Sequence, residues 1–515
     1  MKNRILVLFT IMSLCGIMVS NEINAQKNKK ANPGDSISFY LENELYPDAI
    51  RLIDPMIKKQ PNNTDLLILR GLARMELLDL NGAQQDFRKS LSIEPQNDTA
   101  YYNLGYIEFL EERYGEAIAN YDSAILYNPA GIYYYIARAD AFLEAGSYPL
   151  AADDYRKALQ EKEHLDMAYF GLGLVYLYNE MTDSARYYFS MAIVEDPFDD
   201  EYYYQRGITK YIQGDLGGAL QDFDMSISLA PDNEEALFAR AKLYMETGDL
   251  IPALEDLDLA LQIDSLNLDI INDRGNILLT LGLYGEAIDD FNRILTDNPD
   301  LDITHYNRGL AWYHMGDYKK AIKDLGQAIK INPAEEDYYR YRGAALVLNG
   351  DTTTGFADFR KAIKIAPGKP EIYLLRSSVY AETGAYDLAM QDLERIFKLD
   401  PEYPDLFLNM GKIYAETGEV EEAMKYFDLA ILTDRENPEI FFHRGLLLYN
   451  LDNLEGALDD FDYAIELAPN IPNAYTNRGL IKFELKNEID ACSDWKKAFE
   501  LGSDEAQKLL KKHCR

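Results

Sequence analysis

The chain has 515 residues, of which 47% are hydrophobic and 27% charged, and this composition is typical of a folded protein. Its formal net charge of −36 argues against binding to nucleic-acid phosphates or to an anionic membrane surface. The basic cluster Lys27 to Lys30 lies in a predicted linker, and no other cluster stands out along the sequence. We therefore expect no nucleic-acid partner.

The first 25 residues have the features of a signal peptide for export. Lys2 and Arg4 precede an apolar segment, Ile5 to Val19, and Ala25 offers a cleavage point. The apolar segment is short for a membrane span, and no later segment approaches about 18 consecutive apolar residues. We expect a mature chain without an integral membrane span, in the periplasm or cell envelope, with secretion as the alternative.

The rest of the sequence repeats with a period of 34 residues. Small residues recur in register with Gly309, alanines with Ala321 and prolines with Pro333. A bulky or aromatic residue usually follows the alanine four residues later. No insertion breaks this register over thirteen full units from Thr64 to about Gly502, and a degenerate unit from Lys30 to Asn63 precedes them.

Each unit reads as two helices, as the unit that begins at Asp302 illustrates. Its first helix is predicted to end near Met315, because Gly316 can adopt the left-handed conformation of a C-cap. Its second helix is predicted over 318–331, and the following proline stops it. Gly309 and Ala321 are equally distant from the turn, so we expect them to face each other across an antiparallel hairpin.

This unit, with Gly309, Ala321, Ala328 and Pro333, resembles the tetratricopeptide repeat. The resemblance implies an all-α, right-handed superhelical solenoid of about fourteen 34-residue helix-turn-helix repeats, in which the first helices line a concave groove. The ends of such a solenoid need polar caps. The expected organisation is a signal peptide at 1–25, a linker and the start of a degenerate first repeat at 26–36, the solenoid at 37–502 and a C-terminal capping helix at 503–515.

An arginine precedes the small residue in ten units, and an aspartate lies sixteen residues after each of these arginines. The three full units without the arginine carry Leu104, Leu172 or Met410, and these units also lack the aspartate. Pairing with the neighbouring unit does not fit, because an aspartate would then face a leucine. We interpret the two positions as ten structural ion pairs that hold together the two helices of a unit. They include Arg308 with Asp324, Arg342 with Asp358, and Arg478 with Asp494.

Two cysteines of the mature chain, Cys492 and Cys514, are 22 residues apart and centred on Ser503, just before the predicted capping helix. They should therefore face each other across the last hairpin. An exported location permits a disulfide between them, and the alternative is a pair of buried thiols.

No arrangement of residues indicates catalysis. The five histidines lack metal-ligand spacing, and the sequence contains no HExxH, P-loop or CxxC motif. The uniform repeat also leaves no long loop on which a catalytic site could be built. We expect a non-catalytic protein without a cofactor or a metal.

The groove is the candidate functional surface. The resemblance implies that positions five, nine, twelve and thirteen of each unit point into it, and glutamates recur beside aromatic residues there. Such a groove suits a protein or peptide segment of basic character, so we expect a scaffold for envelope complex assembly. The alternative is a glycan-binding envelope protein that uses the groove tyrosines. The candidate groove residues are Tyr204, Phe238, Lys242, Asn272, Asn276, Tyr306, Leu310, Tyr313 and Arg340.

Overall fold

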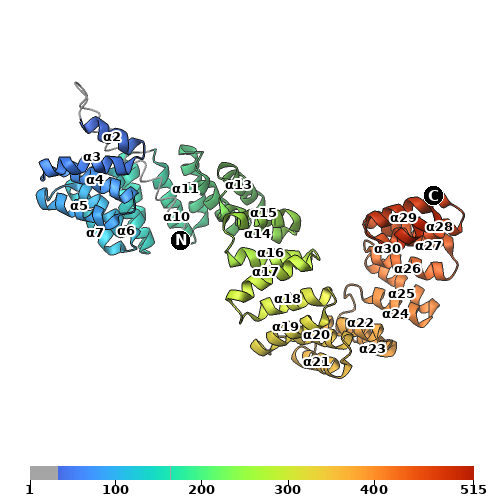
Figure 1. Cartoon of the computed structure of the whole chain (residues 1–515). Coiled ribbons are helices and arrows are strands. Elements are labelled where there is room, and N and C mark those ends of the chain that lie inside the picture. The colour runs from blue at the N-terminus through green and yellow to red at the C-terminus, as the bar shows by residue number, and fades with distance from the viewer. Residues whose placement is uncertain (1–32, 163, 515) are drawn as a thin grey trace. The chain divides into compact units, whose positions relative to one another are not determined.

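The computed structural model describes residues 33–162 and 164–514, and these residues form 29 α-helices joined by short turns (Figure 1). The predicted signal peptide and the first part of the predicted linker lie outside the described residues. All the regular secondary structure in the described residues is helical, so the all-α prediction is confirmed. The helices group into two compact units, one up to Ser265 and one from Leu266, and each is described by itself.

The first unit contains seven antiparallel helical hairpins, and the helices of each hairpin pack on one another. The hairpin α2–α3 corresponds to the degenerate first repeat, so helical structure begins within the segment predicted as a linker and first-repeat start. The helices are α2 (Pro33–Glu42), α3 (Tyr46–Lys59), α4 (Thr64–Glu76), α5 (Leu80–Ile93), α6 (Asp98–Leu110), α7 (Tyr114–Tyr127), α8 (Ile132–Glu144), α9 (Tyr148–Glu161), α10 (Asp166–Tyr178), α11 (Thr182–Glu195), α12 (Asp200–Ile212), α13 (Leu216–Leu229), α14 (Glu234–Thr247) and α15 (Leu250–Ile263).

The second unit contains seven further hairpins and one final helix. Its helices are α16 (Leu268–Thr280), α17 (Tyr284–Asp297), α18 (Asp302–His314), α19 (Tyr318–Ile331), α20 (Glu336–Leu348), α21 (Thr352–Ile365), α22 (Pro370–Glu382), α23 (Tyr386–Leu399), α24 (Leu406–Thr417), α25 (Val420–Thr433), α26 (Pro438–Asn450), α27 (Leu454–Leu467), α28 (Pro472–Glu484), α29 (Glu488–Glu500) and α30 (Asp504–His513). Together the two units hold fourteen hairpins, which matches the number of repeats in the sequence.

The hairpin α18–α19 shows how the residues at the recurring positions determine the fold. Gly316 has φ +78°, the left-handed conformation predicted for the residue that ends the first helix. A Cβ atom on Gly309 would lie 2.9 Å from Leu325 Cγ, so only glycine allows the two helices to approach this closely. The nearest neighbour of Gly309 is thus the bulky residue four places after Ala321, and Ala321 itself is completely buried.

The core is a series of local clusters rather than one large centre. A large side chain lies four residues after the small residue that is in register with Ala321. It packs between the two helices of its own hairpin and against the next hairpin. Phe461, for example, contacts Ala457 and Ile481. Because each hairpin buries its apolar faces only against its neighbours, stability depends on stacking. The large side chains at this position that are at most 1% exposed are Phe87, Tyr121, Tyr155, Phe189, Phe223, Phe291, Phe359, Phe427, Phe461 and Trp495.

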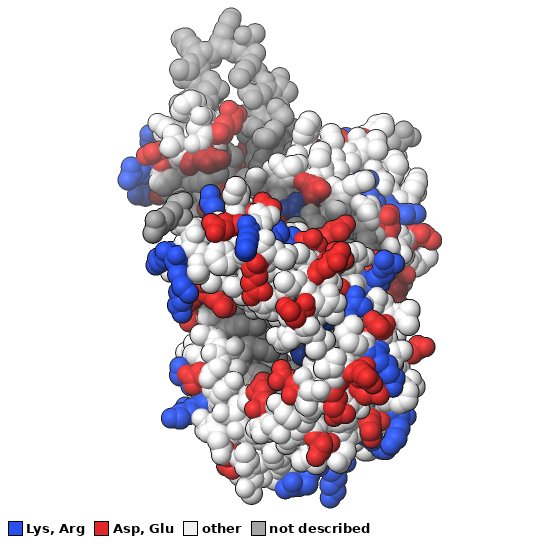
Figure 2. All heavy atoms as spheres, turned by 90° about the vertical axis from the view of Figure 1, so that its right-hand side faces the viewer, with Lys and Arg blue, Asp and Glu red and all other residues white. Residues whose placement is uncertain are grey.

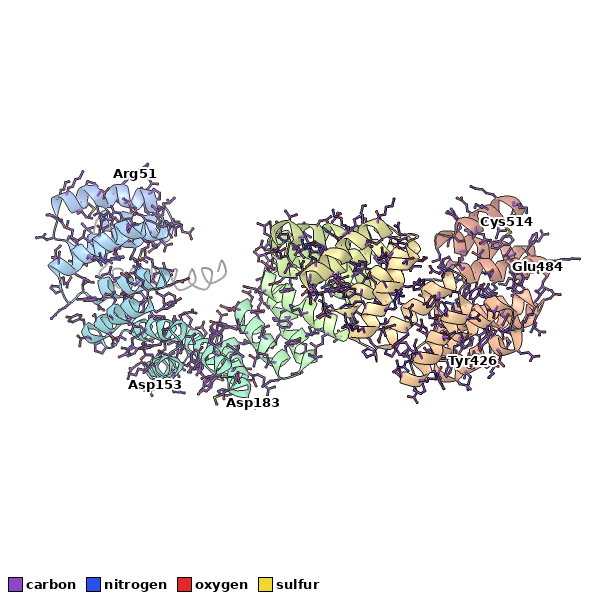
Figure 3. The ribbon with its side chains drawn as sticks, turned by 90° about the horizontal axis from the view of Figure 1, so that it is seen from below. Arg51, Asp153, Asp183, Tyr426, Glu484 and Cys514 are labelled. Atoms are coloured by element: carbon purple, nitrogen blue, oxygen red, sulfur yellow. A yellow bond between two sulfur atoms is a disulfide. The ribbon has the colours of Figure 1, made fainter. Side chains whose placement is uncertain are left out.

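The last helix, α30, covers the apolar end of the second unit. Ser503 caps it, because the Ser503 hydroxyl accepts a hydrogen bond from the backbone N–H of Ala506 at 3.1 Å. Ala506 is fully buried, whereas the lysines of α30 are exposed. Cys492 of α29 and Cys514 are joined by a disulfide with a Cα–Cα distance of 5.8 Å, and Cys514 is labelled in Figure 3. This end of the chain thus has the arrangement expected of a cap.

Candidate functional site

The ten arginine–aspartate pairs form two-point contacts within the hairpins. In every pair the arginine Nε donates to one carboxylate oxygen at 2.7–2.9 Å, and Nη2 donates to the other at 2.5–2.9 Å. The aspartates are 1–7% exposed. A buried carboxylate is costly unless it is paired and hydrogen-bonded, so these contacts satisfy it. The structure therefore brings together Arg308 with Asp324, Arg342 with Asp358, and Arg478 with Asp494.

The arginines also reach the preceding repeat, a contact that sequence reasoning missed. In seven of them Nη1 donates to a side-chain oxygen sixteen residues earlier, at 2.5–3.2 Å. We call this place, sixteen residues before each arginine, the acceptor position. Each of the seven arginines thus bridges one hairpin to the one before it. The acceptors are Asp54, Asp122, Ser190, Asp224, Asn292, Asp428 and Asp462.

A signal for this second contact was present in the sequence. Where leucine replaces the arginine, at Leu104 and Leu172, the acceptor position carries Arg88 and Arg156. In these two repeats a cation occupies the acceptor position and the bridging arginine is absent, although Arg376 and Arg360 occupy both positions in another repeat. The acceptor position lies sixteen residues before the arginine, whereas the aspartate of the same repeat lies sixteen residues after it.

The predicted groove residues lie on the first helices of successive hairpins, and these helices pack on one another, as α8 does on α10 and α20 on α22. We call the side chains at positions five, nine, twelve and thirteen the inner row. In the first unit Tyr204 is half-buried, with its ring centroid 6.3 Å from that of Phe223. Lys242 Nζ lies 4.6 Å from the ring centroid of Phe238, a cation–π contact.

An acidic residue beside this part of the inner row has an unusual environment. Glu201, at the start of α12, accepts a hydrogen bond from Gln205 Nε2 at 2.8 Å. Burial, with a further contribution from the negative charge of Glu235, raises the pKa of Glu201 to about 7. Burial also raises the pKa of Tyr204, and the nearby carboxylates of Glu235 and Glu201 add to this shift. Burial and neighbouring carboxylates thus disfavour a negative charge on Glu201 and on Tyr204.

A second such carboxyl group lies on α8. Asp140, at position nine, accepts a hydrogen bond from the Tyr155 hydroxyl at 2.5 Å. Burial raises the pKa of Asp140 to about 7, and the charge of Glu144 adds to the shift while the hydrogen bond from Tyr155 opposes it. Asp140 in the inner row and Glu201 beside it are thus two carboxyl groups of the first unit that ionise with difficulty.

In the second unit three predicted residues converge on Tyr341, which the sequence did not single out. The ring of Tyr341 has its centroid 5.9 Å from that of Tyr306 and 5.7 Å from that of Tyr313. The Arg340 guanidinium lies 4.7 Å from the same centroid and donates to Asp337 at 2.8 Å. Position six, which Tyr341 occupies, therefore belongs to the surface in this repeat.

The other candidates in the second unit are half-buried. Asn276 Oδ1 accepts a hydrogen bond from Asn307 Nδ2 at 2.8 Å, which ties α16 to α18. Asn272 Nδ2 lies 3.4 Å from Asp273 Oδ1. Leu310 lies one turn from Tyr306 on α18. The amides therefore serve contacts between helices as well as the surface.

Two of the recurring glutamates are held by tyrosines of the preceding repeat. The Tyr211 hydroxyl donates to Glu246 at 2.6 Å, and in the second unit the Tyr449 hydroxyl donates to Glu484, labelled in Figure 3, at the same distance. The hydrogen bond to Glu484 raises the pKa of Tyr449 to about 12. These glutamates are anchored between neighbouring first helices.

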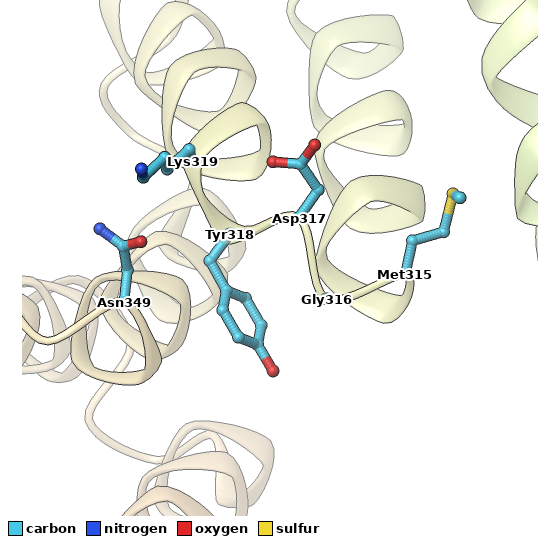
Figure 4. A pocket seen from close by; sticks show the side chains of 6 residues that line it. All are labelled: Met315, Gly316, Asp317, Tyr318, Lys319 and Asn349. Atoms are coloured by element: carbon cyan, nitrogen blue, oxygen red, sulfur yellow. The ribbon is translucent and has the colours of Figure 1, made fainter.

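Over 33–162 and 164–514 no helix is long and apolar enough to span a bilayer. The same stretches contain no group of three or more acidic, histidine or cysteine side chains placed to hold a metal ion. A surface hollow of about 380 Å³ lies at the turn between α18 and α19 and is shown in Figure 4. Its lining residues are Met315, Gly316, Asp317, Tyr318, Lys319 and Asn349.

Stacked helical hairpins in an unbroken 34-residue register define a helical-repeat protein. Models of one family, the tetratricopeptide repeat, match the chain over residues 68–200, 303–334 and 380–441. These parts of the chain therefore consist of tetratricopeptide repeats.

Similar proteins share these repeats over part of their length. A tetratricopeptide repeat-containing protein of Methanocaldococcus jannaschii is 31% identical over 107 residues, which are 21% of this chain and 18% of that protein. Human tetratricopeptide repeat protein 16 is 27% identical over 196 residues, which are 34% of this chain and 22% of that protein. The chain thus spans about a fifth of the length of the curated relatives it matches. A tetratricopeptide repeat protein of Parabacteroides merdae aligns with 46% of this chain and 93% of its own, at 20% identity and a TM-score of 0.36.

Proposed function

We propose that this protein is a non-catalytic scaffold that binds an extended protein segment of basic character along the inner row of its first unit. Tetratricopeptide repeats as a class offer surfaces for protein–protein interaction, and the match of family models over residues 68–200, 303–334 and 380–441 supports the proposal. The choice of a basic segment rests on the environment of Glu201 on α12.

The observation that carries the proposal is the poor solvation of Glu201. Its pKa of about 7 means that the ionised carboxylate is less stable there than in water. A lysine or arginine side chain brought beside it would restore the missing favourable interaction. The half-buried ring of Tyr204 offers the aliphatic part of such a side chain an apolar contact.

This arrangement couples binding to pH. A cation binds the ionised form of Glu201, so below about pH 7 the carboxyl group must release a proton before it can pair. Affinity for a basic segment should therefore fall as the pH is lowered from 8 to 6, whereas affinity for a neutral ligand should not.

The test is a titration of the full chain with a fluorescein-labelled basic peptide, followed by anisotropy. A decapeptide of alternating lysine and serine is the probe, and its acidic and neutral counterparts are compared with it. We expect Glu201→Gln to weaken binding of the basic peptide by about tenfold and to remove its pH dependence. Tyr187→Ala is the matched control, because Tyr187 is exposed on α11, away from the inner row.

Equal binding of the neutral peptide, or equal loss of affinity in the Tyr187→Ala variant, would contradict the proposal. Binding of neutral oligosaccharides that is lost in Tyr204→Ala but kept in Glu201→Gln would instead favour the glycan-binding alternative.

Export to the periplasm or envelope, in support of complex assembly there, is also part of the proposal. The charged and apolar pattern of residues 1–25 supports it, and so does the disulfide Cys492–Cys514, since disulfides persist in oxidising compartments. Fractionation of cells that express the full chain, with sequencing of the mature N-terminus, tests this part. A mature chain that begins at Gln26 in the periplasmic fraction is the expected result.

A further inference from the structure

The arginines that bridge neighbouring repeats show which groups accept hydrogen bonds from their Nη1 atoms. At the acceptor position, five of the seven partners are aspartates, at 2.5–2.8 Å. The other two are Asn292 and Ser190, which also present an oxygen. The chain thus displays the same oxygen-binding place repeatedly, and carboxylate is its usual ligand.

Two arginines lack this third partner within the described residues. Arg342 donates Nε and Nη2 to Asp358, but its acceptor position is Gly326, which has no side chain. A Cβ atom built on Gly326 would lie 3.7 Å from Arg342 Nη1, so this nitrogen faces the place where the aspartates sit elsewhere. Arg376 pairs with Asp392, and its acceptor position carries Arg360, a second cation.

A basic face surrounds these two places. On α19 the residues Lys319, Lys323 and Lys330 are exposed, and their spacing of four and seven residues, with Gly326 between the last two, puts them on one face of the helix. On α21 the residues Arg360 and Lys364 are exposed at the equivalent positions one repeat later. We call these five residues, with Arg342 between the two helices, the α19–α21 basic face.

This face corrects the expectation that the chain has no basic patch beyond Lys27 to Lys30. Within each helix the charges of this face are four or seven residues apart, and the two helices are one repeat apart, so the face forms no run along the sequence. The equivalent positions of α27 carry the opposite charge, in Glu455, Asp459, Asp462 and Glu466. The basic character is therefore specific to α19 and α21 and is not a property of the repeat.

We propose that the α19–α21 basic face binds an acidic protein segment, with a carboxylate of that segment accepting from Arg342 Nη1 at the place that Asp54 occupies beside Arg70. Arg342 is suited to this role, because its side chain is 24% exposed and already oriented by Asp358. The surrounding lysines and Arg360 attract further carboxylates. This surface is separate from the inner row, so the proposal does not depend on the proposed function.

The overall charge of −36 does not prevent such binding. At about 0.1 M ionic strength the Debye length is about 10 Å, so a bound segment experiences mainly the nearby charges. On the face shown in Figure 2, acidic and basic side chains are interspersed. Moderate salt therefore weakens the repulsion from distant acidic residues more than the attraction at Arg342.

The experiment uses the full chain and a fluorescein-labelled decapeptide of alternating aspartate and serine, with anisotropy as the readout. The decisive variant is Gly326→Asp, which supplies the missing acceptor to Arg342 from within the chain. We expect it to weaken peptide binding by about tenfold while raising the melting temperature, because it adds the contact seen at the other arginines. Leu432→Asp is the control, since it makes the same change of charge at an exposed position on α25, outside the α19–α21 basic face.

Retained affinity in Leu432→Asp, within about threefold, supports the proposal together with the loss in Gly326→Asp. Equal weakening in both variants would reduce the effect to nonspecific attraction and overturn the assignment to Arg342. No binding of the acidic peptide by the unaltered chain overturns it as well. Equally tight binding of a single-stranded DNA decamer, with the same response to Gly326→Asp, would overturn the assignment to a carboxylate-bearing protein segment.

Discussion

Arg308 and Asp324 join the two helices of one hairpin by a two-point contact. Arg308 Nε lies 2.7 Å from Asp324 Oδ2, and Arg308 Nη2 lies 2.6 Å from Oδ1. The same arginine donates Nη1 to Asn292 of the preceding hairpin at 2.8 Å. One side chain thus connects three helices, α17, α18 and α19, which explains why the arginine recurs through the sequence.

We predict that replacing only one partner of this pair destabilises the protein strongly. Replacing both partners together should cost less than the sum of the two single replacements. Arg308→Leu or Asp324→Leu alone should cost about 3–5 kcal/mol, because each leaves a charge buried without its partner. The double variant should recover a large part of this cost. Guanidinium unfolding of the four chains, followed by helical circular dichroism, measures the coupling energy.

An exposed pair on the same fold is the control for this cycle. Lys425 and Glu422 are 58% and 44% exposed, so their removal should change stability by about 0–1 kcal/mol. Additive effects at Arg308 and Asp324 would show that the two side chains do not stabilise each other.

The second prediction concerns the disulfide at the C-terminal cap. Cys492 and Cys514 close a segment of 22 residues, so reduction should destabilise this end by about 3 kcal/mol. Hydrogen exchange of α30 with and without dithiothreitol measures the effect. The variant in which both cysteines are serine should not respond to the reductant, and two free thiols in the untreated protein would contradict the disulfide.

The third prediction concerns the turn within the hairpins. Leu78 has φ +60° at the position that Gly316 occupies in its own repeat, and its side chain is 78% exposed. A left-handed conformation disfavours a branched side chain and suits glycine, so Leu78→Gly should stabilise the protein by about 0.5–1 kcal/mol. Gly316→Ala, the reverse change, should destabilise it. Thermal unfolding of both variants is the measurement, and a lower melting temperature for Leu78→Gly would refute the interpretation.

The fourth prediction concerns the pH dependence of stability. Burial raises the pKa of Glu201 to about 7 from an ordinary value of 4.5, so the folded state holds this proton more tightly than the unfolded state does. Its contribution to stability is therefore fully present below about pH 4.5 and is lost as the pH rises through 7. Glu201→Gln should be more stable than the unaltered chain at pH 8, and this advantage should shrink toward pH 5. Denaturation curves at the two pH values test the sign.

Much of the fold could be predicted because the same 34-residue helical hairpin recurs along the chain. The small residue at Gly309, the alanine at Ala321 and the glycine turn at Gly316 recur at one spacing, so the helices and their pairing follow from local rules. The Arg308–Asp324 contact was also predictable, because the arginine and aspartate disappear together in the same repeats.

The candidate surfaces were less predictable for physical reasons. Tyr341 was missed because it occupies position six, where its role depends on Tyr306 and Tyr313 of the preceding hairpin. The second contact of each arginine was missed because it joins two repeats and uses a third nitrogen of the same guanidinium. The effect of burial on Glu201 depends on the packing around it and leaves no pattern in the sequence.

The sequence by itself determined the length of the repeat, the helical hairpin and the ion pairs within it, because these depend on residues at most sixteen positions apart and recur in register. Only the tertiary structure decided how the hairpins share side chains. It placed Arg342 between Gly326 and Asp358, and it gathered the lysines of α19 and the cations of α21 into one face. Such contacts depend on how one hairpin packs against the next, and packing sets which side chains meet, which are desolvated and which are left for a partner.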